Sequence, residues 1–295
     1  MDHKQFLANL PAQDAATLTQ RRNAPGLRHL AGHLGLIVAL GAWIGMGAPL
    51  WWALLPLQGT ALVFLFTLEH EATHKTPFAH EGLNEWVGRV CGLILLLPFE
   101  WFRYFHLAHH RHTNIPGKDP ELDGDQRHFD TWGPFLWHVS GLPYWSAMAR
   151  QLWNNAKGQF AQSYIPPRTH PRLQREARVM LALYGLAAFS LVWSPVLLWV
   201  WFLPVLLGQP VLRLYLMAEH GRCPRVADMF DNTRTTYTNR IVRFLAWNMP
   251  YHTEHHVWPA VPFDRLPDLN QKMQAHLKHE QRGYARFTSD TLRRL

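Results

Sequence analysis

The chain has 295 residues, a formal net charge of +8 at pH 7, and a hydrophobic content of 48% that includes 14 Trp and 16 Phe. It has only two cysteines, Cys91 and Cys223, which excludes a disulfide framework and a cysteine-based metal site. The arginines flank apolar runs and form no separate patch, which argues against nucleic acid and favours a membrane surface or an acidic protein as partner.

Two long runs of the chain contain no Asp, Glu, Lys or Arg, at residues 34–67 and 180–212. One transmembrane helix needs about 20 apolar residues, so each run with its flanks is long enough for two. Glycine and proline interrupt the runs at residues 45–49 and 193–195, where a helix breaks most readily. We therefore predict two helical hairpins, with spans at residues 30–47, 50–68, 178–193 and 196–217.

The remaining segments are expected on the cytoplasmic side. Arginines flank the membrane ends of both hairpins, whereas the tips carry no charge, and basic residues mark the cytoplasmic face. Residues 86–100 include an apolar stretch that is too short to span, which predicts an interfacial helix. Residues 101–175 and 218–295 are predicted to form a helical cytoplasmic cap. The expected fold is a multi-pass, all-α integral membrane protein with one domain over residues 1–295 and both termini in the cytoplasm.

The chain contains 19 histidines, and eight of them fall in three short motifs. The motifs are HEATH at 70–74, HLAHH at 106–110 and HTEHH at 252–256. On a helix, positions i, i+3 and i+4 lie within about a 100° arc, so each motif presents its imidazoles on one face. We expect all three on one side of the membrane, where so many neutral imidazoles would be costly to bury without a metal. The isolated His33, His128, His138 and His170 are assigned no role, and His112 is predicted to point off the ligand face.

These three motifs, in this order around two hairpins, resemble the membrane fatty acid desaturase and hydroxylase superfamily. The resemblance covers about residues 30–267, and NMPYHTEHHVWPAVPF at 248–263 is similar to bacterial acyl-lipid desaturases. It implies a non-haem site with two iron ions, O₂ as co-substrate and a lipid or alkyl substrate. The implied ligands are the eight histidines of the motifs together with a further histidine at the end of the last span, namely His70, His74, His106, His109, His110, His252, His255, His256 and His220.

Ligand type alone does not select iron, because imidazole also binds zinc, copper and nickel. The number of ligands favours two metals, since a catalytic zinc takes three protein ligands and keeps one open position. Ligating histidines normally donate their second ring nitrogen to a carboxylate or carbonyl. The nearby acidic candidates are Glu71, Glu219, Glu254, Asp119 and Asp123. Asn248 would hold water beside His252 if one helix runs through both, or it is an ordinary capping residue.

Several functions remain open at this point. Desaturation and hydroxylation or ketolation of an alkyl or isoprenoid substrate begin with the same hydrogen abstraction, and we favour desaturation. HEATH followed by Leu122-Asp123-Gly124 also resembles an intramembrane zinc protease, although six histidines of the motifs then have no role. A transporter is disfavoured because the predicted spans contain almost no ionisable groups.

The sequence contains neither a haem-binding His-Pro-Gly-Gly stretch nor a cysteine cluster for an iron-sulfur centre. The electrons must therefore come from an external donor, for which we expect a ferredoxin, a rubredoxin or a cytochrome b5-like protein. Positive-inside topology explains the basic cytoplasmic face equally well. The candidate docking residues are Arg222, Arg225, Arg234, Arg240 and Arg243. Arg213 is expected to anchor its helix or reach a lipid head group. The expected location is the inner membrane of a bacterium.

Overall fold

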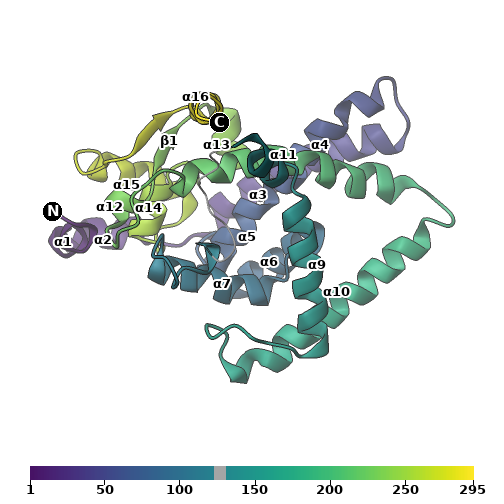
Figure 1. Cartoon of the computed structure of the whole chain (residues 1–295), viewed down its shortest axis with the longest axis horizontal. Coiled ribbons are helices and arrows are strands. Elements are labelled where there is room, and N and C mark those ends of the chain that lie inside the picture. Colours follow the sequence, from purple (N-terminus) through teal and green to yellow (C-terminus); the bar gives the residue numbers. More distant parts are fainter. Residues whose placement is uncertain (123–130) are drawn as a thin grey trace.

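The computed structural model describes residues 1–122 and 131–295, which are mostly helical (Figure 1). The first half of the chain forms two short helices, a long helix, a 3₁₀ turn and four further helices. These elements are α1 (His3–Asn9), α2 (Ala12–Leu18), α3 (Asn23–Gly45), η1 (Trp51–Leu54), α4 (Leu55–Val63), α5 (Leu65–Thr73), α6 (Glu81–Leu95) and α7 (Phe99–His112).

The second half begins with η2 (Pro120–Leu122) and returns through a second long hairpin to a cluster of short elements. These elements are α8 (Trp132–Val139), α9 (Leu142–Lys157), η3 (Pro167–Thr169), α10 (His170–Ser190), η4 (Leu198–Phe202), α11 (Leu203–His220), α12 (Met229–Asn232), β1 (Thr235–Tyr237), α13 (Arg240–Leu245), α14 (His252–Val257), η5 (Phe263–Arg265), α15 (Leu266–Met273), β2 (Glu280–Arg282) and α16 (Tyr284–Leu292). In Figure 1, α10 and the α3–α4 turn extend to the right, whereas α1, α2, α14 and α15 gather on the left.

The predicted membrane-helical fold is confirmed, whereas the bounds of the third span stay a prediction. In the described residues, three helical segments are long and apolar enough to cross a membrane: Ala12–Gly45, Trp51–Thr73 and Leu198–His220. The predicted span at 178–193 is not among them. Its helix, α10, starts earlier, at His170, and its first half carries charged residues. Arg172 and Glu176 there form ion pairs with residues of α6 and α7, so this half is held by polar contacts.

The predicted interfacial segment at 86–100 contains a sharp bend in the structure. It is divided between α6 and α7, whose axes meet at 99° and together form either a broken span or a re-entrant loop. The bend occurs at Leu96, which has a left-handed backbone conformation with φ of 60°. A Cβ on Gly92 would lie 2.2 Å from the Leu97 carbonyl oxygen, so the tight return of the chain requires glycine there.

The cap contains one element that the all-helical prediction missed. Strands β1 and β2 form a two-stranded parallel sheet, in which Thr235 is opposite Glu280 and Tyr237 is opposite Arg282. The three-residue strands are too short to show alternation of apolar and polar residues. The sheet ties the chain after α11 to the segment before α16.

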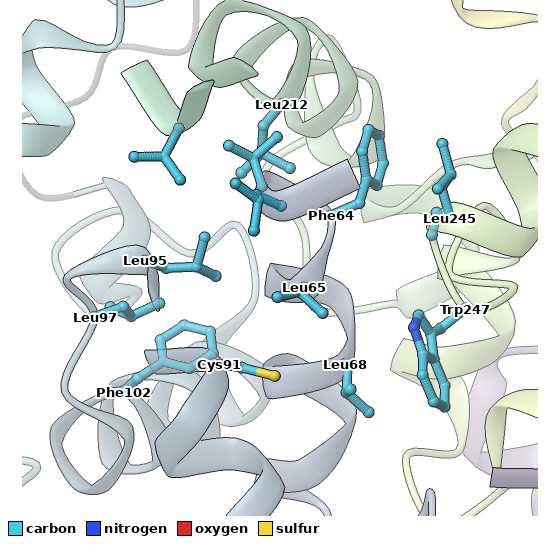
Figure 2. Packing of buried hydrophobic residues seen from close by; sticks show 14 of the residues in the cluster. Phe64, Leu65, Leu68, Cys91, Leu95, Leu97, Phe102, Leu212, Leu245 and Trp247 are labelled. Atoms are coloured by element: carbon cyan, nitrogen blue, oxygen red, sulfur yellow. The ribbon is translucent and has the colours of Figure 1, made fainter. Parts of the chain in front are cut away.

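Close packing of α4 against α11 joins the two hairpins. A Cβ on Gly59 would lie 2.0 Å from the Pro204 carbonyl oxygen, and one on Gly208 would lie 2.3 Å from the Gly59 carbonyl oxygen. Small residues allow membrane helices to approach this closely. The main core continues from this crossing to α6 and α7, and it includes Phe64, Leu68 and Leu212 (Figure 2).

Replacing Gly208 by alanine is expected to destabilise the protein, because the backbone at the crossing must move apart. Overpacking costs about 1–3 kcal/mol, which corresponds to a fall in melting temperature of about 2–12 °C. Thermal unfolding of purified protein in nanodiscs measures this shift. Gly35→Ala is the matched control, since a Cβ there meets nothing within 4 Å. Equal melting temperatures for the two variants would contradict the close crossing.

Candidate metal centre

The first histidine motif lies at the end of α5. His70 is within the last turn of that helix, and His74 follows its last residue, Thr73. His70 is buried and His74 is half-buried. The motif therefore lies at the end of the second membrane-spanning segment, as the sequence predicts.

The other motifs lie on two helices and at the end of a third. His106, His109 and His110 occupy one face of α7, and the third motif forms most of the short helix α14. His220 is the last residue of α11. The structure brings all nine predicted ligands together.

One set of imidazoles comes from α5, α7 and α14. Ligand nitrogens of His70, His106, His110 and His255 all lie within 4.8 Å of one another. The Nε2 atoms of His255 and His110 are 3.1 Å apart. His74 joins this first cluster, because its Nε2 lies 2.8 Å from Nε2 of His106.

A second cluster combines α7, α14 and the end of α11. Ligand nitrogens of His109, His220 and His256 also lie within 4.8 Å of one another. His252 completes this cluster, with its Nε2 3.1 Å from Nε2 of His220. The two clusters adjoin, because the rings of His110 and His256 stack with centroids 4.1 Å apart and an interplanar angle of 8°.

The geometry of these nitrogens fits metal ions. Imidazole–metal bonds of about 2.0–2.1 Å place two neighbouring ligand nitrogens about 2.9–3.4 Å apart at right-angled to tetrahedral geometry. The Nε2–Nε2 separations of 2.8–3.1 Å between His74 and His106, His110 and His255, and His220 and His252 lie close to that range. The Nε2 atom of His256 is buried and has no hydrogen-bond partner. Each cluster can therefore hold one metal.

Three of the predicted carboxylates contact the second ring nitrogen of a clustered histidine. Glu71 Oε1 lies 3.2 Å from His255 Nδ1, and Asp119 Oδ1 lies 2.9 Å from His109 Nδ1. Glu219 Oε1 is 3.5 Å from His252 Nδ1. The contact of Asp119 with His109 is a hydrogen bond, and such a bond fixes the tautomer and orientation of a ligating imidazole so that its other nitrogen faces the metal. Glu71 and Glu219 lie at ion-pair distance from His255 and His252.

Two further orienting residues are absent from the sequence predictions. The hydroxyl of Thr113 lies 3.2 Å from His256 Nδ1, and the Asn232 carbonyl oxygen lies 3.1 Å from His220 Nδ1. Thr113 lies three residues after His110, the last residue of the second motif, so its position was a usable signal. The Asn232 contact is made by a backbone carbonyl, so the identity of the side chain could not have predicted it.

The electrostatics of the cap keep the imidazoles ready for metal. Burial, together with neighbouring histidines, lowers the pKa of His255 and His256 well below the usual value. Burial by itself raises the pKa of Asp119, but the charge and hydrogen bond of His109 and two backbone N–H groups lower it overall. His255 and His256 are thus neutral and Asp119 is ionised at neutral pH, as metal binding requires.

The structure places other predicted outer residues away from the imidazoles. Glu254 accepts hydrogen bonds from Thr235 and Asn270, and burial raises its pKa to about 7. The premise for Asn248 is wrong, because α14 begins only at His252 and Asn248 has a φ of 56°. Its amide contacts Arg243 and the Phe263 carbonyl. Asp123 lies outside the described residues.

The five arginines expected at a docking surface differ in exposure. Arg225 and Arg240 are exposed, whereas Arg222 and Arg243 are half-buried. The prediction for Arg234 requires correction, because its side chain is buried and donates to the carbonyl oxygens of Ala218 and Gly221. Arg234 holds the turn after α11 and presents no charge to a partner.

A cavity of about 270 Å³ opens beside the histidines. Aromatic side chains from α5 and α7, including Phe66, Trp101 and Phe102, line one part of it. Residues of α9 and α11 complete the wall, among them Tyr144 and Arg213. His70, His106, His109 and His252 also line the cavity, so a ligand there reaches both clusters. His138, assigned no role from sequence, lines it as well.

Comparison with known families gives an independent result for the same residues. Residues 49–288, which contain all three motifs and His220, match the family described as fatty acid desaturase. The chain belongs to the fatty acid desaturase family. It is therefore a desaturase-family enzyme with histidine clusters suited to metal binding. Because HEATH packs together with the other two motifs in this family's pattern, the protease interpretation is set aside.

Individual relatives of the fatty acid desaturase family are distant. The chain is 30% identical over 210 residues to sphingolipid delta(4)-desaturase DES1 of Drosophila melanogaster. The aligned region covers 68% of this chain and 59% of that protein. It is 26% identical to the sn-1 oleoyl-lipid 12-desaturase of Anabaena variabilis, over 77% of this chain and 70% of the relative. It is 25% identical to sphingolipid delta(4)-desaturase/C4-monooxygenase DES2 of Mus musculus, over 94% of this chain and 81% of the relative.

Proposed function

We propose that this protein is a membrane-bound di-iron desaturase that uses O₂ to remove two hydrogens from an unactivated alkyl segment of a lipid. The observation that carries the proposal is the pair of adjoining histidine clusters with Glu71, Asp119 and Glu219 behind them. A single catalytic zinc needs only three protein ligands. Nine imidazoles in two sets are the ligand supply for two metals.

The reaction balances with an external source of electrons. One O₂, two electrons and two protons combine with the two hydrogens taken from adjacent carbons, giving one double bond and two waters. Two bound irons supply the redox chemistry for O₂ and the C–H bond. The chain itself orients the imidazoles through Glu71, Asp119 and Glu219 and keeps water from the alkyl segment with Phe66, Trp101 and Phe102 around the cavity.

Hydroxylation is the second candidate function. One relative is named as both a desaturase and a C4-monooxygenase. The alternative reaction is therefore the insertion of one oxygen atom into the same C–H bond. The two outcomes share the metal centre and the first hydrogen removal. Product analysis distinguishes them.

Expression in a host that lacks the enzyme, followed by mass spectrometry of its lipids, tests the proposed function. A new double bond that is absent with His109→Ala supports desaturation. A new hydroxyl group assigns the protein to the hydroxylase alternative. If the wild type and the variant give identical lipid profiles across fatty acid, glycerolipid and sphingolipid pools, the proposal fails.

The proposed electron donor is an acidic ferredoxin, rubredoxin or cytochrome b5-like protein that docks on the cytoplasmic cap. Arg225 is close in sequence to Cys223, whose carbonyl oxygen accepts a hydrogen bond from the Asn114 side chain. The backbone N–H of Asn114 donates to Asp119, the partner of His109. A donor bound at Arg225 would therefore lie near a short path to the second cluster.

Reversing the charge of both exposed arginines, with Arg225→Glu and Arg240→Glu, is expected to slow reduction by an acidic donor by about tenfold or more at low salt. The effect should shrink as the salt concentration rises, because exposed charges are screened. Stopped-flow reduction of the metal centre by a plant-type ferredoxin measures the rate. Arg178→Glu, also exposed and on α10, is the control. A reduction rate that is unchanged at low salt would show that the donor does not dock at Arg225 and Arg240.

We further propose that the termini and the histidine clusters face the cytoplasm of a bacterial inner membrane. The support is the distribution of arginines around the spanning segments. Labelling a cysteine introduced at Arg240 with an impermeant maleimide in intact and opened spheroplasts tests the orientation, since Cys91 and Cys223 are both buried. Labelling of this cysteine in intact spheroplasts would place residue 240 on the outer face and contradict the proposed orientation.

A further inference from the structure

The described wall of the cavity beside the histidines includes an arginine, on a helix that is long and apolar enough to span the membrane. Arg213 lies within α11, is half-buried, and lines the cavity. An ionisable group inside a spanning segment is costly and usually serves a function. The arginine therefore needs an explanation beyond anchoring the helix at the membrane surface.

The guanidinium of Arg213 is held in a defined position. Its Nε donates to Gln209 Oε1 at 3.1 Å, and its carbon atom Cζ lies 4.7 Å from the centroid of the Tyr144 ring. Gln209 is itself fully buried, and a Cβ on Gly141 in the α8–α9 turn would lie 2.7 Å from Gln209 Cβ. Packing of the α8–α9 turn on α11 thus fixes the cation against the cavity.

One face of α11 carries this cation, then apolar groups, then a histidine. Arg213, Leu216, Met217 and His220 occupy positions i, i+3, i+4 and i+7, which fall on one stripe of a helix. The first three line the cavity, and His220 belongs to the second cluster. Arg213 and His220 are separated along the helix axis by about 10.5 Å, from seven residues at 1.5 Å each.

Among the described residues, the acidic groups that line the cavity are Glu121 and Glu219, which lie at the histidine end. Glu219 is 3.5 Å from His252, and Glu121 Oε2 is 3.8 Å from His109 Nδ1. These carboxylates disfavour an anion beside the metals, whereas Arg213 favours one two helical turns away. A volume of about 270 Å³ lies below the roughly 300–1,000 Å³ of most small-molecule pockets, so only part of a lipid fits inside.

We infer that Arg213 binds an anionic oxygen of the substrate's head group, a carboxylate or a phosphate, and thereby places a nearby carbon at the histidine clusters. The inference rests on the proposed oxidation of a lipid, and it adds a substrate class: amphiphiles whose oxidised C–H bond lies within about two helical turns of an anionic group. The apolar stripe of Leu216 and Met217 contacts the carbons between the head group and the reacting bond.

The test is binding without turnover. The full chain in nanodiscs of phosphatidylcholine is labelled with a stearate that carries a photoreactive diazirine near its tail, and labelling is read by intact-protein mass spectrometry. Stearate, stearyl phosphate and stearyl alcohol compete. Stearate or stearyl phosphate should compete at roughly 10- to 100-fold lower concentration than the alcohol, the range for a hydrogen bond to a charged group.

The variants separate the charge from the fold. Arg213→Gln should bring all three competitors to equal potency, Arg213→Lys should keep part of the preference, and the exposed Arg178→Gln should behave as the wild type. Whichever anion competes better identifies the carboxylate or the phosphate as the preferred head group. Equal competition by the alcohol in the wild type, a preserved preference in Arg213→Gln, or no labelling of the wild type would overturn the inference. Because the binding assay uses neither O₂ nor reductant, its result does not depend on whether the proposed oxidation occurs.

Discussion

Replacing His255 by alanine is expected to abolish product formation and to remove iron from the first cluster. His255 is fully buried and lies at the centre of that cluster, with its Nε2 3.1 Å from that of His110 and its ring 4.5 Å from that of His70. Loss of an outer-shell partner alone costs 10- to 100-fold, so we expect turnover to fall by at least about 100-fold. Product yield and iron content per chain are measured on the same preparations.

Two further variants make the His255 result specific. His110→Ala removes a half-buried ligand of the same cluster and should give the same loss of iron. His112→Gln changes the half-buried neighbour that belongs to neither cluster and should leave both quantities unchanged. If folded His255→Ala protein, checked by its melting temperature, retains two irons and normal turnover, the first cluster does not hold metal.

Replacing Asp119 by asparagine is expected to weaken iron binding by roughly 10- to 100-fold while the protein stays folded. The Asp119 carboxylate accepts from His109 Nδ1 and from the backbone N–H groups of Asn114 and Glu121. The amide keeps one acceptor oxygen but loses the charge that fixes the tautomer of His109. Competition with a chelator of known affinity gives the dissociation constant.

The expected loss of affinity in Asp119→Asn should be confined to the second cluster, so that one of two irons is released first. Asp268→Asn is the control, because Asp268 pairs with Arg265 on the surface. Equal chelator resistance of Asp119→Asn and the wild type would show that this carboxylate has no role in holding His109 to a metal.

The site was largely predictable because its ligands are spaced locally. The i, i+3 and i+4 spacing of His106, His109 and His110 sets one face of α7 whatever the tertiary fold. His220 was predicted through the resemblance to the desaturase and hydroxylase superfamily, which implies a further histidine at the end of the last span. Glu71 and Asp119 were among the acidic residues near the motifs, but which histidine each contacts depends on tertiary packing.

The failures have physical causes in longer-range structure. Asn248 was placed by extending a helix that in fact begins four residues later, at His252. Arg234 was counted as a surface charge, yet two backbone carbonyls after α11 draw it into the interior. The prediction at 178–193 rests on the apolar second half of α10, and it gave no sign that the first half of this helix forms ion pairs with Glu100 and Arg89. Hydropathy of a single segment contains no information about such partners.

The metal content of the purified protein tests the central claim most directly. Protein produced with iron supplied and analysed by mass spectrometry of its metals should contain two irons per chain, and iron-57 Mössbauer spectra should show two coupled sites. The nine imidazoles in two adjoining sets predict this stoichiometry. A single zinc per chain, retained when His255 and His220 are both replaced, would contradict the account.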